Sequence, residues 1–143
     1  MLTADRALLR RVGWENEFAY QVQAGSKVFR GSIVALCLDL TVVPAGSANT
    51  GAAQEAVVGI AAEFHDATGA GLPNEYAQAG RYVPCQRGVF LLPFDAPPTA
   101  AAIGQAVYAL DDQVVSLAQG TPAHLRVGVL FGFDERGQPW VQI

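Results

Sequence analysis

The residues able to act as nucleophiles or general bases are few and lie far apart along this chain. Cys37 and Cys85 are its two cysteines, and His65 and His124 are its two histidines. A cysteine–histidine nucleophile pair needs both side chains adjacent in space, and no local motif indicates one here. The thiols also lack the CxxC spacing of a zinc or redox site, although a disulfide between them stays open. We therefore predict no catalytic residue, no metal ligand, no cofactor and no enzymatic activity.

Acidic residues gather at positions typical of turns. Asp39, Asp111-Asp112 and Asp134-Glu135 all follow or interrupt apolar segments. The alternating oxygen ligands and turn glycine of an EF-hand are missing, and paired carboxylates for glycoside hydrolysis would need a cleft that sequence cannot show. Because aspartate favours turns, we interpret these residues as hairpin turns. The glycine-rich runs at 44–52 and 67–71 lack the flanking residues of a phosphate-binding loop.

The composition favours a protein whose surface is partly buried against other subunits. Hydrophobic residues make up 51% of the 143 residues and charged residues only 15%, with a net charge of −4. Such a low charge content predicts apolar surface buried against other subunits, and the acidic balance excludes a nucleic-acid footprint. No stretch approaches the ~20 apolar residues of a membrane helix, and we expect a cytoplasmic origin without a membrane partner.

A passage of the chain occurs twice in altered form, and this repeat sets the expected fold. The segment Gly31–Asp39 matches Gly104–Asp112, 73 positions later, and Val58–Phe64 matches Val127–Phe133, 69 positions later. We predict a mainly β fold, a small barrel or sandwich (β-tulip-like) of two related halves. Strict alternation predicts that one face of these strands is buried. The expected core residues are Val34, Val58, Ile60, Phe64, Val107, Val127, Val129, Phe131 and Phe133.

Secondary-structure signals place the remaining elements. Residues 2–12 read as a short helix with Thr3 as its N-cap, and Thr99 can cap a second helical turn. Predicted strands cover residues 27–36, 40–43, 57–64, 82–94 in a broken form, 106–110, 114–117, 126–133 and 139–143.

The first 23 residues form a predicted N-terminal arm, and residues 24–143 form the β domain. A helix this short is marginal alone, and three aromatic residues within seven positions are costly to expose. The arm is therefore expected to contact a partner, with packing on its own domain as the alternative. The expected contact residues are Leu8, Leu9, Val12, Trp14, Phe18 and Tyr20.

Several sequence segments resemble segments of the capsid proteins of tailed bacteriophages. They are Ala24–Leu36, the Pro-Ala loop at Val43–Ala45, Ile103–Val115, Arg126–Val129 and Gly137–Ile143. On these segments the chain is similar to the head-decoration, or capsid cement, family. The resemblance implies a virion structural protein without an active site. It would form a trimer, sit on the outer capsid surface after synthesis in the bacterial cytoplasm, and clamp neighbouring major capsid subunits.

Other functions stay open beside this one. A different virion role, in the tail tube or in head completion, fits the same β scaffold. A small β-barrel enzyme would need a convergent polar cluster. A sugar- or ligand-binding β module would use Trp14, Tyr108 and Trp140 as stacking platforms.

Overall fold

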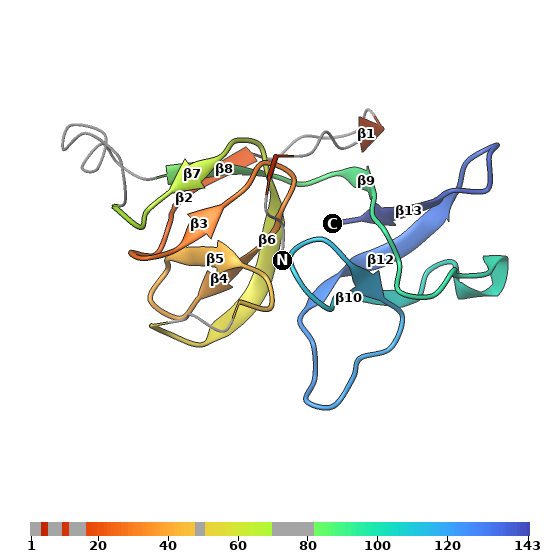
Figure 1. The fold of residues 1–143 in the computed structure, drawn as a ribbon. Coiled ribbons are helices and arrows are strands. Elements are labelled where there is room, and N and C mark those ends of the chain that lie inside the picture. Colours follow the sequence, from red (N-terminus) through yellow and green to blue (C-terminus); the bar gives the residue numbers. More distant parts are fainter. Residues whose placement is uncertain (1–3, 6–9, 12–16, 48–50, 70–81) are drawn as a thin grey trace.

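The computed structural model of the protein describes residues 4–5, 10–11, 17–47, 51–69 and 82–143, and these form a mainly β structure. Two antiparallel sheets lie side by side, one from the first half of the chain and one mainly from the blue second half (Figure 1). The predicted sandwich of two halves is confirmed, and the sheets do not close into a barrel.

The first sheet has the strand order β2-β8-β6-β4-β5. Its strands are β2 (Glu17–Gln21), β8 (Tyr82–Gln86), β6 (Gln54–Ala61), β4 (Ile33–Cys37) and β5 (Val42–Pro44). A two-stranded sheet of β3 (Lys27–Val28) and β7 (His65–Asp66) accompanies it.

The second sheet has the order β1-β9-β13-β12-β10-β11. Its strands are β1 (Arg10–Arg11), β9 (Val89–Leu91), β13 (Pro139–Gln142), β12 (Arg126–Phe133), β10 (Ala106–Ala109) and β11 (Val115–Ser116). A single 3-10 turn, η1 (Ala100–Ala102), precedes β10.

The two halves repeat the same topology. We call residues 17–86 repeat 1 and residues 89–142 repeat 2. Strands β2, β8, β6, β4 and β5 of repeat 1 correspond in sheet position to β9, β13, β12, β10 and β11 of repeat 2. The correspondence extends to single hydrogen bonds. Gly31 donates its N–H to the Ala61 carbonyl, and Gly104 donates to the Leu130 carbonyl, both at 2.8 Å.

Both repeats also contain the same β-bulge. Val34 of β4 pairs with Gly59 of β6, and the next residue of β4, Ala35, pairs with Val57. In the same way Val107 of β10 pairs with Gly128 of β12, and Tyr108 pairs with Arg126. The valine skipped in this way is Val58 in β6 and Val127 in β12. Shared register and a shared bulge confirm the predicted equivalence of the two halves.

The bulge overturns the predicted alternation along β6 and β12. An extra residue shifts the side-chain parity, so Val58 and Ile60 enter different core clusters. Five predicted core residues are buried, namely Val34, Val58, Ile60, Val107 and Val127. Four are not: Phe64 and Phe131 are 43% and 55% exposed, and Val129 and Phe133 are half-buried. Leu130, which the alternation placed on the opposite face, is fully buried.

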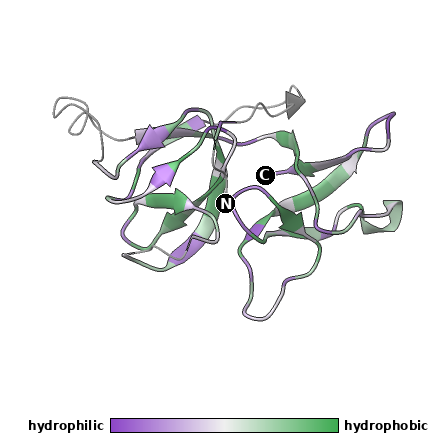
Figure 2. Cartoon of the chain, in the orientation of Figure 1, coloured by the Kyte–Doolittle hydropathy of each residue, from purple (hydrophilic) through white to green (hydrophobic). Residues whose placement is uncertain are grey.

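Two apolar clusters lie on opposite faces of the first sheet. The larger cluster joins the repeats: Ile33, Ala35 and Cys37 of β4 pack in it together with repeat 2. The smaller cluster contains Val34, which lies between Ile33 and Ala35 in β4 and points to the other face, and it also contains Val28 of β3. Figure 2 shows β3 and β7 in purple, hydrophilic strands beside the green strands of the sheet. Strands β4 and β5 of the first sheet are therefore buried on both faces, which explains their near-continuous apolar sequences.

Some predicted elements differ from the structure. Arg10–Arg11 form strand β1, so a helix over residues 2–12 is wrong there, and the rest of that helix lies mostly outside the described residues. The strand expected over 27–36 is divided by a turn, where Gly31 takes φ +89°. Thr99 precedes η1 as predicted, but its side chain makes no capping hydrogen bond.

Candidate functional site

The two thiols lie apart and are held in the protonated form. Cys37 packs in the larger cluster and Cys85 in the smaller one, and both are free and buried. Burial, aided by the nearby Glu17 carboxylate, raises the pKa of Cys85 from 9.0 to about 12. Burial and Asp39 likewise raise the pKa of Cys37, with Thr41 opposing them. Because the thiolate is the reactive form, neither residue is suited to nucleophilic chemistry, and the disulfide left open by the sequence is not formed.

The histidines occupy different repeats. His65 lies in β7, where it pairs with Val28, and its Nε2 is buried without a hydrogen-bond partner. His124 follows β11 and donates its backbone N–H to the Gln119 carbonyl at 2.7 Å. Within the described ranges, no group of three or more His, Cys, Asp or Glu side chains could hold a metal ion.

Asp39, Asp111 and Asp134 cap turns, as their sequence positions predicted, and Asp66 does the same. In four turns an aspartate Oδ1 accepts the backbone N–H two residues later. These pairs are Asp39 with Thr41, Asp66 with Thr68, Asp111 with Gln113, and Asp134 with Arg136. Asp134 also accepts the indole N–H of Trp140 through Oδ2, at 3.1 Å. These carboxylates are engaged in local structure.

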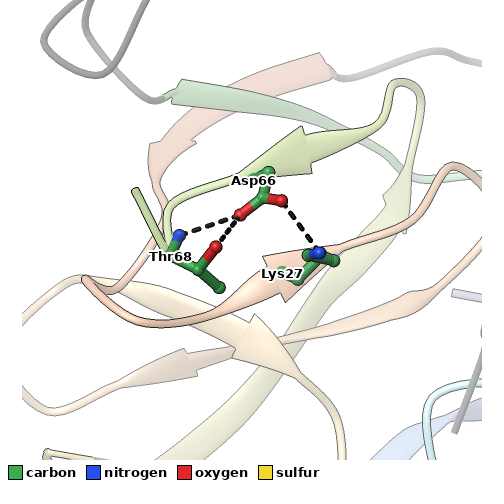
Figure 3. A network of polar contacts seen from close by, with 3 residues as sticks. All are labelled: Lys27, Asp66 and Thr68. Atoms are coloured by element: carbon green, nitrogen blue, oxygen red, sulfur yellow. Dashed lines mark hydrogen bonds and ion pairs between the residues drawn. The ribbon is translucent and has the colours of Figure 1, made fainter. Parts of the chain in front are cut away.

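Asp66 is the centre of a small polar network between β3 and the turn after β7 (Figure 3). Its Oδ2 lies 2.9 Å from the Lys27 ammonium, and its Oδ1 accepts from the Thr68 backbone and hydroxyl. Desolvation alone would raise the pKa of Asp66, but the hydrogen bonds from Thr68 and Lys27 outweigh it. The pKa falls from 3.8 to about 2. The network fastens the hydrophilic β3–β7 pair beside the smaller cluster.

Asp112 has a role that the sequence did not reveal. It is 1% exposed, and its carboxylate accepts a hydrogen bond from the Ser32 hydroxyl at 3.0 Å. Its carbonyl also accepts the N–H of Ile33 at 2.7 Å. The turn between β10 and β11 therefore docks on the start of β4 and joins the repeats through polar contacts. The one available signal was the match between Asp112 and Asp39 in the repeated segments.

The surface carries large apolar side chains on both repeats. We call the following set the exposed apolar residues: Phe18, Leu38, Leu40, Phe64, Tyr82, Ile103 and Phe131, each between 43% and 72% exposed. Leu38 and Leu40 occupy the turn between β4 and β5, and Leu40 takes φ +65°. Ile103 and Phe131 each adjoin a residue of one backbone hydrogen bond, which Gly104 donates to the Leu130 carbonyl. Side chains of this kind mark protein-binding surfaces when they gather.

Two pockets lie against the β12–β13 hairpin. The larger has a volume of about 430 Å³, and its lining is mainly apolar: Leu91, Leu92, Pro93, Phe94, Pro97, Pro98, Phe133, Gly137, Gln138 and Pro139. The smaller, about 260 Å³, is lined by Phe131, Gly132, Phe133 and Trp140. In repeat 1 the corresponding segments close on each other through the β3–β7 pairing. In repeat 2 the 3-10 turn η1 occupies the position in the chain that β3 has in repeat 1.

The predicted stacking platforms have different environments. Trp140 is 6% exposed and hydrogen-bonded to Asp134, so it offers no open ring face beyond its edge of the smaller pocket. Tyr108 is half-buried in β10. Trp14 lies outside the described residues.

The last part of the predicted arm, from Glu17 to Gln21, is strand β2 of the first sheet. Leu8, Leu9, Val12 and Trp14 lie outside the described residues. Phe18 and Tyr20 lie in β2, which pairs with β8 over its whole length, so the arm does not extend to residue 23. Tyr20 packs on the smaller cluster of its own chain, whereas Phe18 is 58% exposed.

Comparisons with protein-family models, with curated proteins and with solved structures find no match for this chain. Among the described residues, no helix has the length and apolar character needed to cross a membrane.

Proposed function

We propose that this protein is a virion structural protein that decorates a tailed-bacteriophage capsid and stabilises it by clamping neighbouring major capsid subunits. The observation that carries the proposal is the set of exposed apolar residues, which occurs on both repeats. Large apolar side chains that gather in water favour binding to other proteins over binding to small polar molecules. The segments that resemble capsid cement proteins supply the class of partner.

The scaffold suits a protein that resists deformation. The repeats share one apolar cluster and are joined by the buried contact between Ser32 and Asp112. Two repeats fixed in this way present contact surfaces at a constant separation, which a clamp across neighbouring subunits requires. The resemblance further implies a trimer on the outer surface of the shell, where an acidic chain avoids packaged nucleic acid.

The test begins with the gene neighbourhood, which should contain a major capsid protein gene. Shells assembled from that capsid protein are then mixed with the purified chain and sedimented. We expect saturable co-sedimentation at a fixed ratio to capsid subunits. Absence of binding by a folded chain to mature and immature shells would contradict the proposal.

Variants identify the contact surface in the same assay. Replacing both Leu38 and Leu40 by Ser should weaken shell binding, whereas Glu55→Gln, at an exposed position of β6, should leave it unchanged. Deleting residues 2–9 tests the start of the arm and should weaken shell binding if the arm is a contact. The deletion must end before Arg10, because β1 pairs with β9 in the second sheet and β2 is part of the first.

The larger pocket favours a second candidate, a module that binds an apolar ligand. Pockets of roughly 300–1,000 Å³ with mostly apolar walls are typical small-molecule sites. Titration with 1-anilinonaphthalene-8-sulfonate should then show saturable fluorescence that Phe133→Gln weakens. Equal fluorescence from this variant and the parent would contradict the pocket as the binding site.

A further inference from the structure

Within the described residues, the outer edge of β2 has no partner strand, whereas β1 covers the corresponding edge in repeat 2. β9 corresponds to β2, and β1 pairs with it through Arg10–Phe90 and Arg11–Val89. Among the described residues, no strand pairs with the outer edge of β2 at residues 17–19. Phe18 is 58% exposed, whereas its counterpart Phe90 is 2% exposed. Each repeat therefore has an outer strand edge that can accept another strand, and the described part of the chain fills only the edge in repeat 2.

The backbone groups on this edge can be assigned from the register. Pro84 accepts the N–H of Ala62 at 2.8 Å, so its carbonyl points away from β2. Because neighbouring residues of a strand alternate in direction, Val83 and Cys85 bond toward β2. Their partners there are Tyr20 and Phe18. Glu17 and Ala19 consequently direct their N–H and C=O groups outward, which leaves a template for a further strand.

We propose that two copies of this chain pair antiparallel through β2, about a two-fold axis that passes beside Phe18. In this register Glu17 of each copy faces Ala19 of the other, and these outward-directed residues exchange backbone hydrogen bonds. The two Phe18 side chains face each other as a directly opposed aromatic pair. No like charges are opposed, because the residue facing each Glu17 is an alanine.

A second copy fits this edge better than other occupants. The open stretch is short because Val22, just beyond β2, bridges Val42 of β5. Pairing centred on Phe18 uses this stretch fully and is self-complementary, as a two-fold interface must be. It also covers the apolar Phe18 ring, which an unrelated polar strand would leave exposed. This inference goes beyond the proposed function and does not depend on it. The two-fold contact uses β2, and a three-fold assembly on a capsid would have to use a different surface of the chain.

Cysteine cross-linking tests the register directly. Opposed residues of a non-hydrogen-bonded pair have Cα atoms about 4.5 Å apart, within disulfide reach. Under mild oxidation, Phe18→Cys should therefore form a covalent dimer, whereas Leu38→Cys, an equally accessible site at the β4–β5 turn, should not. Both variants are made in a Cys85→Ala background, because Cys85 is the cross-strand neighbour of Phe18 on β8 and would compete for the new thiol within one chain. Cys37 is buried in the other cluster. A folded Phe18→Cys chain that stays monomeric, or that cross-links no faster than Leu38→Cys, overturns the proposal.

Sedimentation velocity of the full chain over a hundredfold concentration range provides the second test. The parent should shift from monomer to an even-numbered species as concentration rises. Ala19→Pro removes the outward N–H without touching the bonds between β2 and β8, so it should abolish this shift while the thermal melt stays unchanged. Leu38→Ser should associate as the parent does. A parent that never associates, or an association that Ala19→Pro leaves intact in a folded chain, also overturns the proposal.

Discussion

The Asp112 carboxylate accepts a hydrogen bond from the Ser32 hydroxyl at 3.0 Å, across the boundary between the two repeats. Both residues are almost fully buried, at 1% and 0% exposure. A buried polar contact of this kind contributes little net stability when complete, but it is costly to break. It therefore fixes how the repeats sit against each other more than it strengthens either of them.

Asp112→Ala should destabilise the protein by about 1–3 kcal/mol, because the Ser32 hydroxyl is left buried without this acceptor. Asp39→Ala is the matched control, since Asp39 occupies the equivalent position in an exposed turn. Losing a solvent-exposed turn bond should cost less. Urea unfolding monitored by tryptophan fluorescence gives both values. Equal costs for the two variants would contradict a special role for Asp112.

The bulge glycines should not tolerate a side chain. A Cβ at Gly59 would lie 2.6 Å from the Gln86 carbonyl oxygen, and at Gly128 it would clash with the Gln142 carbonyl. Gly59 also has φ +145°. Because backbone cannot move aside as a side chain can, Gly59→Ala and Gly128→Ala should each cost about 1–3 kcal/mol or more. Thermal and urea unfolding measure the loss.

Gly132→Ala is the control for these variants. It lies in the same strand as Gly128, but a Cβ there meets nothing within 4 Å. The substitution should be neutral or stabilise by a few tenths of a kcal/mol through the unfolded chain. Destabilisation of all three variants to the same degree would show that close backbone approach is not the cause.

Neighbouring residues of β12 should respond very differently to truncation. Leu130 is fully buried in the shared cluster and Phe131 is 55% exposed. Leu130→Ala should cost about 2–5 kcal/mol by leaving a cavity. Phe131→Ala should cost less than about 1 kcal/mol, since most of its ring is already in water. The reverse order in urea titrations would mean that the register of β12 is shifted by one residue.

The protein should lose stability in acid partly through Asp66. Its pKa is lowered to about 2 in the folded state, so it binds a proton less readily there than in the unfolded chain. Its contribution is complete above about pH 4 and is lost as pH falls toward 2. Asp66→Asn should therefore be less stable than the parent at pH 5, and the difference should shrink toward pH 2.

Glu55→Gln makes the same change of net charge at an exposed site and serves as the control for this pH series. Urea midpoints measured between pH 2 and 5 compare the three proteins. A constant gap between parent and Asp66→Asn across this range would exclude the Lys27–Thr68 network as the source.

The sequence predicted the architecture well because the duplication left a signal in both copies. Matched glycines and valines identified equivalent strands, and the turn aspartates were correctly interpreted. The predicted burial of side chains was wrong where a bulge residue, Val58 or Val127, shifts the register of the strand. Nothing in the sequence shows that Val58 and Val127 form bulges, so the alternation placed Phe131 inside. Phe64 was placed inside because the strand was expected to run to residue 64, whereas β6 ends at Ala61.

The candidate site was less predictable, for a physical reason. The partners of Ser32 and of Phe18 are decided by which surfaces meet after the strands have paired. Asp112 was one of several turn aspartates until the packing of repeat 2 on β4 buried it. The position of β2 within the first sheet likewise depends on β8, more than 60 residues away in sequence.

The pairing of the first strand of each repeat with its last has a consequence during synthesis. β2 finds its partner only when β8 has left the ribosome, and β9 can pair with β13 only after β13 has been made. The hairpin of β4 with β5, closed by a short turn, can form first and offer an apolar face early. Repeat 1 can then complete itself and serve as the template on which repeat 2, whose core includes residues from β4, condenses last.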